Sequence, residues 1–126
     1  MKQKKTIESD KIIDCIVKGI QEKKGKEILS IDLTKINNAA CRYFIICHGD
    51  SNTQVNAIAH SIEKVMQENL QEKVWHSQGY ENAQWILLDY FDYMVHIFQK
   101  DTREFYNLES LWGDGQINHF TEVLVN

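Results

Sequence analysis

The sequence predicts one domain of the α/β (α+β) class, in which helices pack against a mixed β-sheet. Apolar residues recur at helical spacing in two segments, 12–20 and 55–70. A short apolar run at 42–48 is typical of a buried strand, and a hairpin-like pair of strands follows at 85–98. Helices and strands that first alternate and then end in antiparallel strands indicate a mixed sheet.

Composition limits the classes of protein to consider. The chain has 126 residues, which is enough for one domain with its own core. It is 43% hydrophobic and 25% charged, as soluble globular proteins are, and no apolar run is long enough to span a membrane. We therefore expect a cytoplasmic location and no membrane partner. Three cysteines without CxxC spacing are expected to be inert thiols.

Charge argues against a protein that holds nucleic acid through a broad basic face. The formal net charge is −4 and the sequence pI is about 5.7, whereas neutralisation of phosphates supplies most nucleic-acid affinity. We expect no DNA partner, and a basic protein is the easier electrostatic partner. Contact between RNA and the basic N-terminal residues Lys2, Lys4 and Lys5 stays open.

The first half of the chain is predicted to run from a helix through two strands into a second helix. The first helix should end near Gly25, and a strand at 27–33 and a turn at 35–40 should follow. Ser51 opens the second helix and forms a capping box with Gln54. In such a box the hydroxyl accepts a backbone N–H of the first turn, and the amide reaches back to the cap residue.

Alternation in the hairpin 85–98 divides its side chains between two faces. One face is purely aliphatic and consists of Ile86, Leu88, Val95 and Ile97. The other face consists of Trp85, Leu87, Asp89, Met94, His96 and Phe98. This mixture of aromatic, acidic and imidazole groups suits a surface that grips another molecule better than it suits a core. Trp85 is the expected anchor of that surface.

Two further segments are predicted on either side of the hairpin. A short strand is expected near 73–76, and a helical or turn-rich segment at 101–112. The expected apolar anchors of the segment 101–112 are Phe105, Tyr106, Leu108 and Leu111. Its expected solvated side consists of Asp101, Arg103, Glu104 and Glu109. We place the domain at 1–112 and leave open whether the tail 113–126 packs back or stays loose.

No strong catalytic or metal-binding signature is present. The tract HGDSNTQ joins a strand to a helix and could hold a phosphate, but a capped turn also explains it. Asp89 and Asp92 are separated by a turn and Asp32 stands alone, so no carboxylate pair for Mg²⁺ is evident. The histidines show no HxxxH or HExxH spacing, and no GxSxG tract occurs.

Five tracts keep an order and spacing that make a composite pattern. They are RYFIICHGDSNTQVNAIA from Arg42, Gly79 followed by Trp85, WILLDY from Trp85, VHIF from Val95 and REFYNLESLW from Arg103. Together they resemble the Iojap-like ribosomal silencing factor family, also called RsfS. Each tract alone is a weak signal, but their order over about seventy residues makes the match specific.

The resemblance implies a nucleotidyltransferase-like topology without the catalytic carboxylates, no enzymatic activity and no cofactor. It implies a translational repressor that binds the large ribosomal subunit at ribosomal protein fourteen. Binding there would sterically block association with the small subunit and slow translation under nutrient limitation. The ribosomal-protein-binding residues implied are Trp85, Leu87, Asp89 and Tyr90, with Met94, His96 and Phe98 beside them.

Two positions depart from the family pattern. Gln78 stands where glutamate is common before Gly79, and Phe91 stands where glycine is common in the hairpin turn. A tight turn with positive φ does not favour phenylalanine, so we expect a wider loop. The alternative functions are a nucleotide-binding or nucleotidyltransferase-like enzyme, suggested by the Gly49 to Ser51 turn, and a homodimer formed through the hairpin face.

Overall fold

The computed structural model describes residues 2–123, with side chains described from Lys11 onward. Its elements are α1 (Lys2–Glu22), β1 (Lys26–Asp32), β2 (Tyr43–Gly49), α2 (Asn52–Leu70), β3 (His76–Gln78), β4 (Trp85–Asp89), β5 (Tyr93–Gln99), α3 (Lys100–Tyr106), α4 (Leu108–Leu111) and β6 (Gln116–Phe120). The strands form one sheet in the order β3-β4-β5-β2-β1-β6. Among the described strands β2 and β5 alone pair in parallel and the other neighbours pair antiparallel, so the predicted mixed sheet is confirmed.

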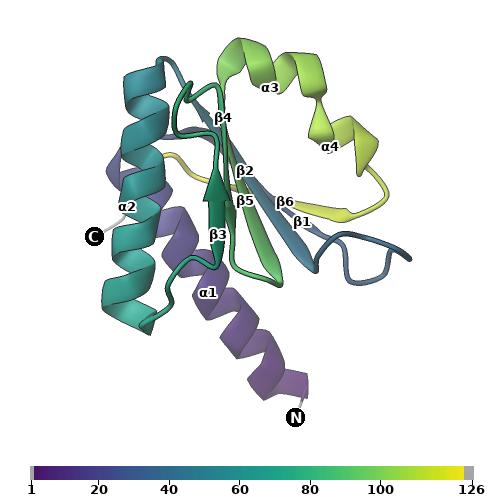
Figure 1. The fold of residues 1–126 in the computed structure, drawn as a ribbon. Coiled ribbons are helices and arrows are strands. Elements are labelled where there is room, and N and C mark those ends of the chain that lie inside the picture. The colour runs from purple at the N-terminus through teal and green to yellow at the C-terminus, as the bar shows by residue number, and fades with distance from the viewer. Residues whose placement is uncertain (1, 124–126) are drawn as a thin grey trace.

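The sheet forms the middle layer of the molecule (Figure 1). Helices α1 and α2 cover one face, whereas α3 and α4 lie over part of the opposite face. The first two helices are long and the last two are short, so the two faces are covered unequally. No helix in the described part of the chain is long and apolar enough to cross a membrane.

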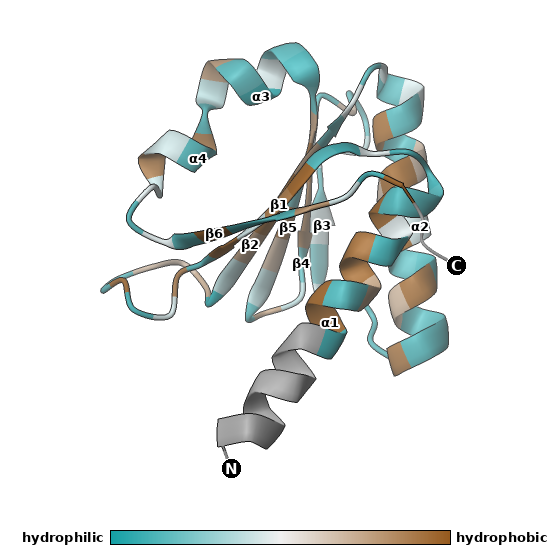
Figure 2. Cartoon of the chain, turned by 180° about the vertical axis from the view of Figure 1, so that it is seen from behind, coloured by the Kyte–Doolittle hydropathy of each residue, from teal (hydrophilic) through white to brown (hydrophobic). Residues whose placement is uncertain are grey.

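The aliphatic face of the hairpin lies beneath α1 and α2, as the alternation predicts. Ile86, Leu88, Val95 and Ile97 are all fully buried in this core. Hydrophobic residues recur along both helices that cover them (Figure 2). Burial of each such side chain stabilises the fold by about 1.5–3 kcal/mol relative to exposure.

Helices α1 and α2 approach each other closely at Gly19. A Cβ atom at this position would lie 2.8 Å from the Cα of Ile62, which is closer than real Cβ atoms approach. The Ser61 hydroxyl donates a hydrogen bond to the Gly19 carbonyl over 2.7 Å. The helix pair therefore needs a glycine at this point, and the pair forms the outer layer over the sheet.

The N-terminus of α2 confirms one half of the predicted capping box and corrects the other. The Ser51 hydroxyl accepts a hydrogen bond from the backbone N–H of Gln54 at 3.1 Å. The Gln54 side chain does not return to Ser51, because its Oε1 accepts from the N–H of Asp50 at 2.7 Å. Its Nε2 donates to the carbonyls of Lys23 and Lys24, which tie the turn after α1 to the start of α2.

The hairpin turn between β4 and β5 is tight, so the expected wider loop is wrong. Phe91 adopts a φ of 70°, the left-handed conformation that glycine would adopt more readily. The Asp89 carboxylate accepts a hydrogen bond from the Phe91 N–H at 2.8 Å, and this bond holds the turn. The Phe91 ring also packs against Trp75, with ring centroids 4.8 Å apart.

Two other segments lie differently from the sequence expectation. Strand β3 spans His76–Gln78 rather than 73–76, because pairing with β4 begins at His76 opposite Asp89. The segment after residue 112 packs back as β6, an edge strand in which Ile117 pairs opposite Ile31 of β1. Residues 124–126 of the predicted tail lie outside the described residues.

The cysteines are free thiols, and two of them, Cys15 and Cys47, are buried. Burial raises the pKa of Cys41 to about 11 and that of Cys47 to about 12. Both thiols therefore stay protonated at neutral pH, which agrees with the expectation that they are inert.

Candidate functional site

The strand register brings the mixed side chains of the hairpin onto one surface. Trp85 pairs opposite Phe98, Leu87 opposite His96, and Asp89 opposite Met94. Strand β3 extends this surface because His76 lies opposite Asp89 and Gln78 opposite Leu87. We call the exposed or partly exposed members of this surface the open face: His76, Gln78, Trp85, Leu87, Asp89 and Met94.

The open face exists because α3 and α4 cover only the neighbouring half of the sheet. Leu108 and Trp112 pack with Phe44 of β2 in a second hydrophobic cluster. The Trp112 and Phe44 rings meet edge to face with centroids 5.8 Å apart. The same cluster contains Leu29 and Ile31 of β1. Strands β1 and β2 are thereby shielded, while β3 and β4 keep partly exposed side chains.

Trp85 is held in position by polar and aromatic contacts. Its indole Nε1 donates a hydrogen bond to Nδ1 of His96 over 3.1 Å. Its ring lies 4.9 Å from the Phe98 ring and 4.8 Å from the Tyr106 ring, between centroids. Because the side chain remains partly exposed, it offers a fixed apolar surface with little conformational freedom left to lose on binding.

His96 supports the open face from beneath. It is only 5% exposed, and burial lowers its pKa to about 4. The neutral ring accepts from the indole at Nδ1, so its proton resides on Nε2, which has no hydrogen-bond partner among the described residues. The ring packs edge to face on Phe44 at 4.5 Å. His96 therefore acts through Trp85 rather than by direct exposure.

The seven site residues that the sequence predicts fall into three groups in the structure. Trp85, Leu87, Asp89 and Met94 are partly exposed on the open face. His96 and Phe98 lie on the same side of the sheet but are buried below that surface. Tyr90 is not brought together with them, because it packs in the core beneath α1 and α2 and is 8% exposed. Burial also raises the pKa of the Tyr90 hydroxyl.

A polar network around the buried Arg103, which no local sequence pattern indicates, joins α3 to the sheet. Arg103 was expected on a solvated side, but it is buried. Its Nε donates to Glu109 Oε2 at 3.1 Å, and its Nη1 lies 2.9 Å from His48 Nδ1. The pKa of His48 is lowered by its burial and by the adjacent Arg103 charge.

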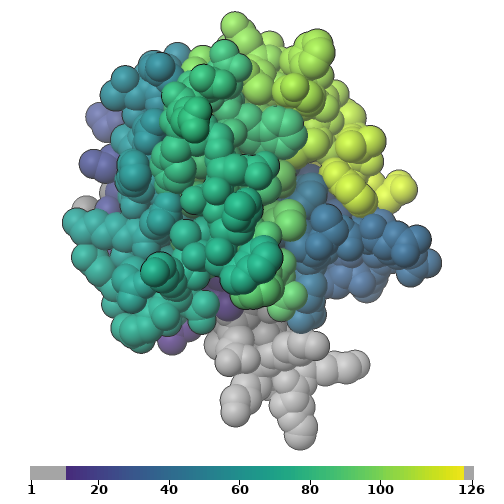
Figure 3. Space-filling model, in the orientation of Figure 1, coloured from purple at the N-terminus to yellow at the C-terminus, as the bar shows by residue number. Residues whose placement is uncertain are grey.

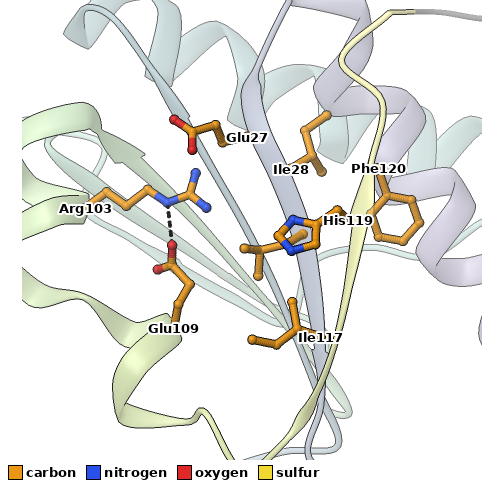
Figure 4. Close-up of a pocket in the computed structure, with 8 residues that line it drawn as sticks. Glu27, Ile28, Arg103, Glu109, Ile117, His119 and Phe120 are labelled. Atoms are coloured by element: carbon orange, nitrogen blue, oxygen red, sulfur yellow. Dashed lines mark hydrogen bonds and ion pairs between the residues drawn. The ribbon is translucent and has the colours of Figure 1, made fainter.

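This network borders a pocket of about 270 Å³ between α3–α4 and the edge strand β6 (Figure 4). Arg103 and Glu109 lie on one side of it, and Ile117 and His119 on the other. The spacing of six residues between Arg103 and Glu109 follows no helical pairing rule. The bend at Asn107, which has a φ of 47°, brings the two side chains together, and the sequence does not reveal that bend.

The surface of α3 and α4 also differs from the expectation. Among the four predicted apolar anchors only Leu108 is buried. Phe105, Tyr106 and Leu111 are 81%, 50% and 71% exposed. The apolar side chains thus point to solvent, while the arginine that was expected outside is buried.

The turn between β2 and α2 is poorly suited to hold a phosphate, because its polar groups already have partners. The Asp50 N–H is already engaged by Gln54, and the Asp50 carboxylate forms an ion pair with Lys26 at 3.0 Å. The turn therefore holds a carboxylate and an N–H that is already engaged, and neither favours the binding of a phosphate. In the described residues no group of three or more His, Cys, Asp or Glu side chains is arranged to hold a metal ion.

Fold and site together define a small α+β domain with two helices on one sheet face and a tryptophan-centred open surface on the other. The family model described as "Ribosomal silencing factor during starvation" matches residues 6–124. The chain belongs to this ribosomal silencing factor family, RsfS, as the composite sequence pattern predicts.

Individual relatives agree with this assignment. The ribosomal silencing factor RsfS of Halalkalibacterium halodurans is 42% identical over 106 residues, which cover 84% of this chain and 89% of that protein. The chloroplastic protein Iojap of Zea mays is 32% identical over 86% of this chain and 49% of its own length. A crystal structure of a Chromobacterium violaceum protein matches with a TM-score of 0.78 and 31% identity, covering 93% of this chain and 92% of that one.

Proposed function

We propose that this protein is a translational repressor that binds the large ribosomal subunit at ribosomal protein fourteen. Bound there, it blocks association with the small subunit and slows translation when nutrients are limited. Family membership supports the proposal, and the open face centred on Trp85 is the structural observation that carries it. We place the protein in the cytoplasm with the ribosomes on which it acts.

The open face has the composition of a protein-binding surface. Trp85, Leu87 and Met94 supply apolar area, and Asp89 supplies a carboxylate. Partly exposed tryptophans at the centre of an interface commonly carry much of its binding energy. A net charge of −4 favours encounter with a basic ribosomal protein and disfavours indiscriminate binding to RNA. The side chains of Lys2, Lys4 and Lys5 lie outside the described residues.

The proposed mechanism is steric and requires no chemical step. A protein seated on the subunit-joining surface prevents the small subunit from docking for as long as it stays bound. Repression then depends on affinity and residence time rather than on turnover. A homodimer formed through the same face would compete with ribosome binding, because both need Trp85 exposed.

Co-sedimentation with purified large ribosomal subunits tests the proposal. We expect the wild-type protein in the subunit fraction at physiological salt, and we expect Trp85→Ala to weaken binding by about 2 kcal/mol or more. His60→Ala is the control, because it removes an exposed ring from α2 on the other side of the sheet. Failure of the wild-type protein to sediment with the subunit would refute the proposal.

A further inference from the structure

The outer surface of α3 and α4 carries apolar side chains that the fold itself does not use. Phe105 is 81% exposed and Leu111 is 71% exposed. The Phe105 and Tyr106 rings lie 5.1 Å apart between centroids, and exposed apolar side chains that adjoin one another mark interaction sites more often than isolated ones do. We call the set of Phe105, Tyr106 and Leu111 the outer patch.

The exposure of the outer patch is fixed by contacts on the inner side of the same segment. Arg103 is buried and joined to Glu109, and its Nη1 also lies 3.4 Å from the Lys26 carbonyl of β1. Leu108 is buried against the sheet. With these inner residues anchored, Phe105 and Tyr106 must point outward. The exposure of Phe105 and Tyr106 therefore follows from the way in which α3 and α4 are anchored on the sheet.

The outer patch is continuous with the open face. Tyr106 contacts Trp85 with ring centroids 4.8 Å apart, and Phe105 meets Tyr106 edge to face at 5.1 Å. A row of three rings thus leads from strand β4 onto the outside of α3. In the space-filling view, the light-green atoms of α3 and α4 adjoin the darker green atoms of the strands (Figure 3).

The exposed charges along the outer patch are mainly acidic. From Lys100, the first residue of α3, to residue 114, the exposed charged side chains are Lys100, Asp101, Glu104 and Asp114. The other basic residue of this stretch, Arg103, is buried and paired with Glu109. An acidic and aromatic surface repels phosphates but suits Lys and Arg side chains, whose charges meet carboxylates while their stems lie on aromatic rings.

We propose that the outer patch is a second half of the docking surface and binds a basic polypeptide segment on the large ribosomal subunit. This inference rests on the proposed function, because the partner is the same subunit. It adds a surface on α3 and α4 that the expected site residues on β4 and β5 do not include. Trp85 and Tyr106 form the junction between the two halves.

The test compares the affinity of large subunits for wild type, Phe105→Ala, the charge reversal Glu104→Lys and the control His60→Ala. We expect Phe105→Ala to raise the Kd about tenfold, as truncation of an interface aromatic commonly does. Glu104→Lys should also weaken binding, and it should reduce the sensitivity of the Kd to salt. Because both side chains are exposed, Phe105→Ala and Glu104→Lys should keep the wild-type melting temperature.

Each result has a distinct meaning. If Phe105→Ala and Glu104→Lys bind large subunits as tightly as wild type does, the outer patch is not part of the docking surface. The proposed function would still stand. Tighter binding of Glu104→Lys would indicate contact with RNA and would also overturn the proposal. The same holds if Phe105→Ala changes only self-association in sedimentation velocity. If wild type does not bind large subunits, both the proposed function and this inference are refuted.

Discussion

At the scale of single residues, the position of Trp85 depends on a buried histidine. The indole N–H of Trp85 needs an acceptor. His96 provides one only while its imidazole is neutral and Nδ1 carries no proton. Burial keeps it neutral by lowering the pKa from 6.5 to about 4. Protonation of His96 would turn the acceptor into a donor and would place an unpaired charge in the core.

This arrangement predicts that stability falls in mild acid. Between about pH 6.5 and about pH 4 the unfolded state binds a proton at His96 that the folded state does not, so unfolding becomes easier as the pH falls. The loss should reach about 3 kcal/mol at most. Urea unfolding at about pH 7 and about pH 4.5 measures it.

The matched variant for this prediction is His96→Asn, whose amide oxygen can replace Nδ1 as an acceptor but cannot titrate. The difference in unfolding free energy between the two pH values should shrink relative to wild type. Part of this pH-dependent difference in unfolding free energy should remain, because the lowered pKa of His48 also makes unfolding easier at lower pH. An unchanged pH dependence in His96→Asn would contradict the role assigned to His96.

At the scale of elements, a partly buried ion pair between Arg103 and Glu109 fixes α3 and α4 on the sheet. Arg103 links α3 to β1 through the Lys26 carbonyl and to β2 through His48, and Glu109 balances its charge. Removal of Arg103 would leave the Glu109 carboxylate without its partner. Removing one member of a fully buried pair commonly costs about 3–5 kcal/mol, and the partial exposure of Glu109 puts this pair at the lower end of that range.

We therefore expect Arg103→Ala to lower the free energy of unfolding by about 3 kcal/mol and to loosen α3 and α4. Urea unfolding and amide hydrogen exchange in residues 100–111 measure both effects. Lys100→Ala is the control, because it removes an exposed cation at the start of the same helix and should change stability by less than about 0.5 kcal/mol. Equal stability of the two variants would show that the ion pair does not anchor these helices.

The hairpin turn makes a second prediction at this scale. Phe91 occupies a left-handed conformation in which a Cβ is strained, and the contact between its ring and Trp75 offsets part of that strain. Alanine loses the ring and keeps the strain, whereas glycine loses both. Phe91→Gly should therefore be more stable than Phe91→Ala by about 1 kcal/mol in urea unfolding. A less stable glycine variant would contradict the assigned turn geometry.

At the scale of the whole molecule, most of the fold could be predicted from local patterns. Alternation in 85–98 correctly separated Ile86 and Leu88 from Trp85 and Leu87, because strand geometry dictates this division. The strand β6 could not be predicted, since an edge strand buries few side chains and needs little apolar pattern. The tight turn at Phe91 was also missed, because phenylalanine is disfavoured at positive φ and the ring contact that offsets this strain is with the distant Trp75.

The candidate site could be predicted only in part. Alternation identified which side chains share one face of the sheet, but it does not reveal which part of that face a later helix covers. His96 and Phe98 are buried for this reason, although they share the face with Trp85. The burial of Arg103 depends on the bend at Asn107, which tertiary packing imposes. Long-range contacts of this kind leave no local pattern in a sequence.

The proposed function of the whole molecule is to prevent subunit joining by occupying the large subunit through the open face. Light scattering of mixed large and small ribosomal subunits measures joining directly. Saturating wild-type protein should reduce it, and Trp85→Ala at the same concentration should have little effect, with His60→Ala behaving as wild type. Undiminished joining of large subunits that carry bound wild-type protein would contradict the claim.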